Sequence, residues 1–412
     1  MPPDRDSSRP LRIVLLEPAG RGGIHQYSRA LARALADSGV DVLFVTARDH
    51  EFATVDRAAP PPFRCAPLFA RRQTPPRALL AALRDFAPDV IHLQSGTHPL
   101  LHWLLLLAAR RATGAPVVVT AHDLVPKNGG KFAALAALAL HRAADRVIVH
   151  GNGLRDELAR TLRDGASRVR VLPHGEASEL VAVARALDRA DGAEPDAAEI
   201  PESPTSDRAP TLLFFGYLHE EKGLPDLIAA LPEIASRVPD ARLVIAGTPE
   251  MAIEPLKEQA RALGVAARIE WRLGYVAAAA LPELFSAVTA VVLPYRKASQ
   301  SGVVFLAGAF ALPLIATRVG ALEEVVRDGE TGLLVPPGNP QEFAKACSEL
   351  LSDRARARNM GKKLSIRCRD EWSWTAIGAK TRAIYRELAA EVSGDENVVD
   401  RRGHARHAAS RT

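Results

Sequence analysis

Residues 212–224 of this 412-residue chain have the sequence LLFFGYLHEEKGL. The apolar run predicts a buried strand that ends at Gly216, and Lys222-Gly223 stands directly before a stretch with helical spacing. Such a loop lies at the carboxyl edge of a parallel sheet, which is the usual ligand position in α/β proteins. The glycines and the ammonium group favour a diphosphate as ligand, although a surface lysine beside a turn glycine is the commoner explanation of this motif taken alone.

Short β-branched runs alternate with helical patterns over most of the chain. In the first half an apolar run at 13–16 is followed by Gly20-Arg21-Gly22-Gly23 and by helical spacing that ends at Gly39. This alternation predicts parallel sheets covered by helices on both faces, and hence an α/β fold with two Rossmann-like domains. The predicted strands are 13–16, 40–46, 89–93, 117–120, 146–150 and 169–172 in the first half, and 211–215, 242–246, 268–271, 290–293, 314–317 and 333–335 in the second.

The domain boundaries follow from changes in composition. An acidic stretch rich in Ala and Pro interrupts the alternation, and a polar, Arg-rich segment ends the chain. The predicted organisation is an N-terminal domain at 1–187, a linker or loose loop at 188–210, a C-terminal domain at 211–371, a helix at 372–392 that packs back on the N-terminal domain, and a disordered tail at 393–412.

Composition restricts the partners of the protein. The chain has 53 basic and 48 acidic residues, and the formal charge of +5 is too small to dictate a partner. It has no aromatic and basic platform for nucleic acid, no secretory signal, and no apolar run near the roughly 20 residues that a membrane span requires. We therefore expect a cytoplasmic protein that does not bind nucleic acid, with contact to the inner face of the membrane left open.

The sequence contains no pattern typical of a metal site. Cys65, Cys347 and Cys368 are odd in number and lie far apart, with no Cys or His at metal-ligand spacing, so we expect reduced thiols. Asp4-Arg5-Asp6 has the DxD pattern but lies in a polar N-terminal tail, where we interpret it as a chance match. We therefore expect neither a metal nor another cofactor.

Two further motifs follow in the second half. Leu293-Pro294-Tyr295 is followed by Ser299-Gln300-Ser301-Gly302-Val303, which opens an apolar helix. N–H groups at a helix start favour phosphate, so we expect this helix end and Lys222 to share one diphosphate, with a simple serine cap as the alternative. The third motif, at 319–338, has the sequence VGALEEVVRDGETGLLVPPG.

In this order and spacing the three motifs resemble the C-terminal domain of the retaining glycosyltransferases of the GT-B fold, the large family-four group. Gly22-Gly23-Ile24 resembles the glycine loop of that family and Thr120-Ala121-His122-Asp123 its histidine motif. Segments 145–149 and 172–175 match further landmarks, so the resemblance covers residues 11–392. It implies two domains facing across a cleft, an NDP-sugar donor held mainly by the C-terminal domain, a glycan, lipid-linked or small-molecule acceptor held mainly by the N-terminal domain, transfer with retention, and no metal.

The resemblance and the predicted sheet edges together give the candidate site. We expect catalytic roles for His122, as a neutral imidazole that bonds a hydroxyl of the donor sugar, and for Lys222, whose charge stabilises the leaving diphosphate. Structural histidines and tight glycine turns are the alternatives. The candidates for the donor diphosphate are Gly22, Gly23, Gly216, His219, Lys222, Ser301, Gly302 and Val303. The candidates for the nucleobase, ribose or sugar are Arg272, Tyr275, Tyr295 and Gln300, and those for the acceptor are His25, Asp123 and His150.

The sequence departs from the family pattern at the paired glutamates. Most members carry one glutamate that contacts the sugar and another that contacts the ribose, whereas those positions are Ala298 and Leu306 here. Gln300-Ser301-Gly302 resembles the segment found in a branch that lacks the pair. The usual contacts of these carboxylates therefore cannot be carried over to this chain.

A second departure concerns the arginine of the phosphate loop, whose positions are occupied by Tyr217 and His219. His219 replaces an arginine only as a neutral donor or when protonated, so the grip on the diphosphate is weaker or depends on pH. Two alternatives stay open, namely a sugar-nucleotide epimerase on the same scaffold and a non-catalytic scaffold subunit that binds nucleotide sugar.

The acceptor is the least defined part of the prediction. Basic residues in the first half are candidates for contact with anionic lipid, as in family members that extend lipid-linked glycans, and a solvated basic face is the alternative. These residues are Arg71, Arg72, Arg77, Arg84, Arg110 and Arg111.

Overall fold

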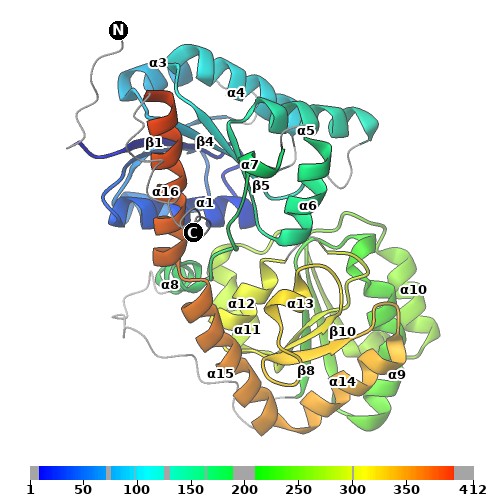
Figure 1. The fold of residues 1–412 in the computed structure, drawn as a ribbon. Coiled ribbons are helices and arrows are strands. Elements are labelled where there is room, and N and C mark those ends of the chain that lie inside the picture. The colour runs from blue at the N-terminus through cyan, green and yellow to red at the C-terminus, as the bar shows by residue number, and fades with distance from the viewer. Residues whose placement is uncertain are drawn as a thin grey trace, which may run out of the picture. The chain divides into compact units, whose positions relative to one another are not determined.

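The computed structural model describes residues 9–70, 76–96, 98–124, 130–162, 165–188, 209–298 and 301–393. The chain divides into two compact units, Met1–Pro173 with Trp374–Thr412, and His174–Ser373 (Figure 1). The DxD string at 4–6, the arginines at 71 and 72, Gln300, most of the predicted linker and the predicted tail from 394 onward lie outside the described residues.

The first unit contains a seven-stranded sheet with the order β3-β2-β1-β4-β5-β6-β7, and all its pairings are parallel. Its central strands are buried on both faces, which explains their continuous β-branched sequences. The strands are β1 (Arg12–Leu16), β2 (Asp41–Ala47), β3 (Arg64–Phe69), β4 (Val90–Ser95), β5 (Val117–Ala121), β6 (Arg146–Val149) and β7 (Val169–Val171). The prediction from the sequence missed β3, an edge strand that contains Pro67.

Two apolar cores cover the two faces of this sheet. One of them joins α1 and the C-terminal helix α16, with Leu31 and Tyr385 both completely buried. The Tyr385 hydroxyl lies 2.5 Å from Nδ1 of His92 on β4, and Glu391 pairs with Arg146. The predicted C-terminal helix that returns to the first domain is therefore confirmed. The helices are α1 (Gly22–Asp37), α2 (Ala53–Ala58), α3 (Pro76–Phe86), α4 (Pro99–Thr113), α5 (Lys131–Ala143), α6 (Asn152–Thr161), α7 (Gly165–Arg168) and α16 (Trp374–Ser393).

The second unit contains a six-stranded parallel sheet with the order β10-β9-β8-β11-β12-β13 around one continuous core. The strands are β8 (Thr211–Phe215), β9 (Arg242–Gly247), β10 (Ile269–Leu273), β11 (Ala290–Leu293), β12 (Leu314–Thr317) and β13 (Gly332–Val335). The helices are α8 (Ser178–Asp188), η1 (Glu220–Lys222), α9 (Leu224–Arg237), α10 (Glu254–Ala262), η2 (Ala266–Arg268), η3 (Ala278–Ala280), α11 (Leu281–Ser286), α12 (Val303–Ala309), α13 (Leu322–Val325), α14 (Pro340–Ser352) and α15 (Arg354–Glu371).

The boundary between the units lies earlier in the chain than predicted. The first unit ends at Pro173 rather than at residue 187. The reason is α8, whose Val181 is 5 % exposed and belongs to the core of the second unit. Composition marks the acidic stretch that follows α8, but it carries no information about which core the helix joins.

Each sheet reverses its strand order beside the first strand of its unit. In the first unit β1 lies between β2 and β4, and in the second β8 lies between β9 and β11. At such a switch point the two following connections leave on opposite faces of the sheet, which opens a crevice at the carboxyl ends of the strands. The glycine-rich loops after β1 and β8 both start at these points, so the predicted fold class of two parallel α/β domains is confirmed and each unit has an edge suited to a ligand.

Candidate functional site

The loop after β8 is fixed by glycines packed against neighbouring backbone. Gly216 has φ +118°, and a Cβ on Gly247 would lie 1.8 Å from the Gly216 carbonyl oxygen. Gly223 has φ +68°, and a Cβ there would lie 1.8 Å from the carbonyl oxygen of Pro294. Only glycine is tolerated at such approaches. The two ends of the loop therefore pack closely against the backbone at the ends of β9 and β11.

Lys222 lies in this loop above an aromatic ring. Its Nζ is 3.6 Å from the centre of the Tyr295 ring, and the Tyr295 side chain is 1 % exposed. Arg296, the next residue, donates two hydrogen bonds to Asp226, at 2.8 and 2.7 Å, and so ties the end of β11 to the first turn of α9. A fixed ring beneath a cation holds the ammonium group in place.

The start of α12 lies beside the same tyrosine. The Ser301 Oγ is 3.2 Å from the Tyr295 hydroxyl, and a methyl of Val303 is 3.8 Å from the position that a Cβ on Gly216 would occupy. The structure therefore brings Lys222, Tyr295 and residues 301–303 together at the switch point of the second sheet. Gln300, predicted to contact the sugar or ribose, lies outside the described residues.

His174 belongs to this region, although the sequence prediction gave it no assigned role. Its ring stacks on Phe305 of α12 with the centroids 4.9 Å apart, and its Nε2 is 3.8 Å from the position of a Cβ on Gly302. Burial lowers the pKa of His174 to about 4, although the hydrogen bond of Nδ1 to the Gly175 carbonyl opposes this shift. The imidazole is therefore neutral at pH 7. In the sequence, this histidine was marked only as part of segment 172–175, which matches a landmark of the family.

The other donor candidates lie along the edge of this sheet. His219 Nδ1 accepts the Glu221 N–H at 3.4 Å, so this side chain caps the start of η1. Arg272 Nε donates to Glu270 at 2.6 Å in an exposed surface pair. Tyr275 is 44 % exposed and follows Gly274, whose N–H donates to the Gly247 carbonyl at 2.9 Å. Tyr275 therefore lies next to a residue that is hydrogen-bonded to Gly247, which packs against the glycine loop after β8. It is the exposed aromatic candidate for contact with the nucleobase.

In the first unit, Glu17 organises the loop after β1. Its carboxylate is 1 % exposed, accepts the N–H groups of Ala19 and Gly20 at 2.9 Å each, and lies 2.6 Å from His25 Nδ1. Burial raises the pKa of Glu17, but the hydrogen bonds and the His25 charge outweigh burial and the net pKa is lowered. Glu17 is therefore an ionised anchor of the loop, which no motif in the sequence indicated.

The two predicted glycines of this loop differ in what they do. Gly22 has φ +76°, a conformation that favours glycine on its own account. A Cβ on Gly23 would meet no atom within 4 Å, so the fold does not require glycine at that position. The tight-turn explanation therefore accounts for Gly22, whereas the absence of a side chain at Gly23 leaves open space beside the loop.

His25 does not lie where an acceptor could reach it. The side chain is 0 % exposed and stacks against Phe44 and Phe52, with centroids 5.7 and 5.6 Å away. Its Nδ1 is used by Glu17. This placement corrects the expectation of an acceptor contact, because His25 helps to hold the glycine loop from inside the unit.

His122 and His150 form a polar chain at the ends of β4, β5 and β6. His122 Nε2 lies 2.9 Å from the side-chain oxygen of Gln94, and His122 Nδ1 lies 3.3 Å from His150 Nε2. His150 Nδ1 donates to the Leu172 carbonyl at 3.0 Å. Tyr27 of α1 contacts both imidazoles edge-on, with centroids 5.0 Å away. A sugar hydroxyl that bonds His122 therefore has to compete with these partners.

Asp123 follows His122 at the end of β5 and is half-buried. Gln94 was not predicted, because a glutamine at the end of a strand gives no signal until the neighbouring strand places His122 beside it. The structure thus gathers His122, His150 and Asp123 at one sheet edge and excludes His25 from it.

Comparison with known proteins identifies the family. Residues 21–176 match the model of Glycosyltransferase Family 4, and residues 209–353 match that of Glycosyl transferases group 1. The chain is 30 % identical to alpha-maltose-1-phosphate synthase of Mycolicibacterium smegmatis over 70 % of this chain and 78 % of that protein. It is 28 % identical to D-inositol 3-phosphate glycosyltransferase of Paenarthrobacter aurescens over 90 % and 94 %.

Solved structures share the fold. Sucrose-phosphate synthase from Thermosynechococcus elongatus matches with a TM-score of 0.66 at 24 % identity, over 92 % of this chain and all of that one. Anabaena HepE, solved with UDP and glucose, matches with a TM-score of 0.68 at 19 % identity over the same shares. The fold and the loop after β8 define a two-domain glycosyltransferase of the GT-B type. The chain belongs to the family-four, group-1 glycosyltransferases.

Proposed function

We propose that this glycosyltransferase moves a sugar from an NDP-sugar to a glycan, a lipid-linked glycan or a small-molecule acceptor, with retention of anomeric configuration and without a metal. The observation that carries the proposal is the grouping of Lys222, Tyr295 and the start of α12 at the switch point of the second sheet. The relatives named as synthases and glycosyltransferases, and the HepE complex with UDP and glucose, support a nucleotide-sugar donor.

The charges and amides of the second unit fit a diphosphate leaving group. As the bond between the anomeric carbon and the diphosphate breaks, negative charge grows on the phosphate oxygens. The Lys222 ammonium, held by the Tyr295 ring, and the backbone N–H groups at 301–303 would stabilise that charge. Gly216 and Gly302 carry no side chain that would block the approach of the phosphates.

The nucleoside has to be bound without the paired glutamates. Leu306 is 7 % exposed and belongs to the core, and Ala298 has no polar group to offer. Tyr275, half-exposed at the end of β10, is the candidate on which a base would stack. Arg272 was predicted to contact the nucleotide. In this proposal it is instead a surface residue whose guanidinium pairs with Glu270.

The test is a reaction with labelled UDP-, GDP- and ADP-sugars and a panel of acceptors, in which product configuration is read by NMR. Transfer with an unchanged anomeric configuration supports the proposal, and inversion contradicts retention. Conversion of the free donor into its epimer would establish the epimerase alternative, which the relatives do not favour. Donor binding without any turnover would establish the scaffold alternative.

We expect chelator to leave transfer unchanged. Among the described residues, no group of metal ligands lies beside the diphosphate candidates of the second unit. An ammonium and backbone amides would supply the charge stabilisation that a divalent cation supplies elsewhere. The measurement is the initial rate before and after EDTA treatment and buffer exchange. Complete loss of activity that manganese or magnesium restores would contradict this expectation.

A face of α4 and α5 supports contact with a membrane surface. The two helices pack together and expose large apolar side chains without a single Asp or Glu in either helix. Lys131, Arg111 and Arg142 are exposed on them. The exposed apolar residues are Leu100, Leu101, Leu104 and Leu107 of α4 and Phe132 and Leu135 of α5. An apolar face with only basic charges fits an anionic lipid surface.

The predicted basic residues contribute unequally to this proposed face. Arg111 is exposed, whereas Arg110 pairs with Asp145 and donates to the Ala143 carbonyl. Arg77 and Arg84 are exposed on the neighbouring α3. No helix among the described residues is long and apolar enough to cross a bilayer. The proposed contact is therefore peripheral.

We expect the double substitution Phe132→Ser and Leu135→Ser to lower binding to vesicles by about thirtyfold or more, since each exposed side chain would bury apolar area worth roughly 1 kcal/mol or more and the two together about 2 kcal/mol or more. The two residues are 73 % and 65 % exposed, so the fold does not depend on them. Cosedimentation with phosphatidylglycerol vesicles measures the effect. Leu263→Ser, at a 40 % exposed position of the second unit, is the control. Equal binding of all three proteins would contradict the assignment of this face.

A further inference from the structure

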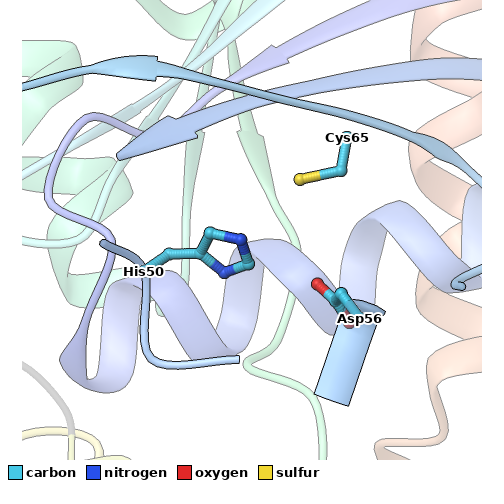
Figure 2. Close-up of side chains that lie close together, drawn as sticks. All are labelled: His50, Asp56 and Cys65. Atoms are coloured by element: carbon cyan, nitrogen blue, oxygen red, sulfur yellow. The ribbon is translucent and has the colours of Figure 1, made fainter. Parts of the chain in front are cut away.

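Three side chains able to bind a metal face one another in the first unit (Figure 2). His50 lies in the loop after β2, Asp56 on α2 and Cys65 on β3, and one ligand atom from each lies within 4.8 Å of the others. No metal-ligand spacing marks these residues in the sequence, because only the fold brings them together. Because β2 and β3 pair, the chain between them brings His50 and Asp56 back to the strand that carries Cys65.

The histidine is buried and incompletely satisfied. His50 is 7 % exposed, and its Nδ1 has no hydrogen-bond partner among the described residues. Its ring points toward the other two side chains (Figure 2). Leaving a buried polar atom without a partner costs about 1–3 kcal/mol. An ion bound through Nδ1 would offset part of that cost.

The surrounding charges define what the cluster can hold. Burial lowers the pKa of His50, so its imidazole is neutral and has a lone pair to donate. Burial raises the pKa of the Cys65 thiol to about 11, so a cation that binds there displaces its proton. The Arg29 guanidinium donates to Asp56 Oδ1 at 2.6 Å, which reduces the negative charge of the cluster.

The combination of thiol, imidazole and carboxylate selects the kind of ion. Thiolate and imidazole suit zinc and similar transition metals, whereas magnesium and calcium prefer oxygen ligands only. Three protein ligands leave a fourth position of a tetrahedral ion for water. We propose that His50, Asp56 and Cys65 form a binding site for a zinc-class metal ion.

The site would act on the structure of the first unit rather than on sugar transfer. A Cβ on Gly20 would lie 3.3 Å from His50 Cβ, and the Glu51 N–H donates to the Gly20 carbonyl at 2.9 Å. His50 therefore packs against the first glycine of the loop after β1. An ion on His50 would fix the β2–α2 connection and the loop that rests on it, and its removal would lower stability while transfer continues.

The test uses the untagged full chain, treated with chelator, exchanged into metal-free buffer and titrated with cobalt(II). We expect thiolate-to-cobalt charge-transfer absorption that saturates at one equivalent, disappears on addition of zinc and does not disappear with magnesium. Zinc should also raise the Tm, because it binds the folded state. Absence of the charge-transfer band, or its displacement by magnesium, would overturn the proposal.

Variants assign the band to these residues. Cys65→Ser should abolish it, and His50→Gln and Asp56→Asn should each weaken cobalt binding by at least about tenfold. Cys347→Ala, in the core of the second unit, and His98→Gln, at an exposed position, are the matched controls and should leave the band unchanged. A band that survives in Cys65→Ser, or that is lost in Cys347→Ala, would place the metal elsewhere. Circular dichroism of each variant confirms folding, and if Cys65→Ser does not fold, the affinity of His50→Gln decides.

Discussion

Replacing Lys222 by alanine is expected to lower the rate of sugar transfer by at least about tenfold while the protein stays folded, which corresponds to about 1.4 kcal/mol of transition-state stabilisation. The ammonium lies 3.6 Å from the centre of the Tyr295 ring, beside the start of α12. In the variant, the negative charge that develops on the leaving diphosphate would no longer be stabilised by Lys222, which is the only lysine in the loop after β8.

Lys222 also has a structural contact with the Tyr295 ring, and the experiment has to separate the loss of this contact from the loss of its chemical role. A cation–π contact contributes about 0.5–2 kcal/mol, so its loss should lower the Tm by only a few degrees. Lys222→Arg keeps the cation and the ring contact, and we expect it to recover part of the activity. Lys257→Ala, at a half-buried residue of α10 that pairs with Glu254, is the control and should transfer sugar like the wild type.

Separate measurement of kcat and kcat/KM shows whether Lys222 acts in the transition state. If Lys222 stabilises charge in the transition state, kcat and kcat/KM fall together. If Lys222→Ala transfers sugar like the wild type at normal stability, the phosphate site does not lie at this loop. Loss of activity with a Tm lowered by tens of degrees would instead make Lys222 a structural residue.

The strand pattern could be predicted because parallel strands that are buried on both faces read as apolar, β-branched runs. The strands β8, β11 and β12 have the predicted limits, and most others differ by one or two residues. The missed strand β3 has the sequence RCAPLF and lies at the sheet edge, where half-exposed positions and a proline weaken the signal. That omission also concealed the cluster around Cys65, because its position depends on the pairing of β2 with β3.

The candidate site could be predicted only where neighbouring motifs in the sequence share a sheet edge. Lys222 and Ser301 lie on connections that follow the adjacent strands β8 and β11, so their order along the chain indicated their proximity. Glu17 and Gln94 belong to no motif, and their contacts with His25 and His122 arise only in the fold, whereas His174 was marked by its place in the landmark 172–175. His25 shows the opposite error, since a histidine next to a glycine loop was predicted to face a substrate and is completely buried.

The substitution of Gly302 by valine is expected to damage nucleotide binding more than Ser301→Ala does. The proposed phosphate contact at 301–303 is made by backbone N–H groups, so a branched side chain at Gly302 would obstruct the diphosphate. The fold itself should accept valine, because Gly302 has φ −61° and the nearest atom to an added Cβ is His174 Nε2 at 3.8 Å. A loss of affinity would therefore report on the ligand rather than on strain.

The serine variant probes the side chain instead of the backbone. Ser301→Ala removes a hydrogen bond to the Tyr295 hydroxyl, with a cost to stability of about 1 kcal/mol, and leaves the amides of the segment in place. Gly302→Ala adds a single carbon and should lie between the wild type and valine in affinity. Calorimetric titration with the preferred nucleotide diphosphate, after circular dichroism of each variant, gives the order. Wild-type affinity in Gly302→Val would move the diphosphate away from α12, because two methyl groups cannot occupy the path of a phosphate without weakening its binding.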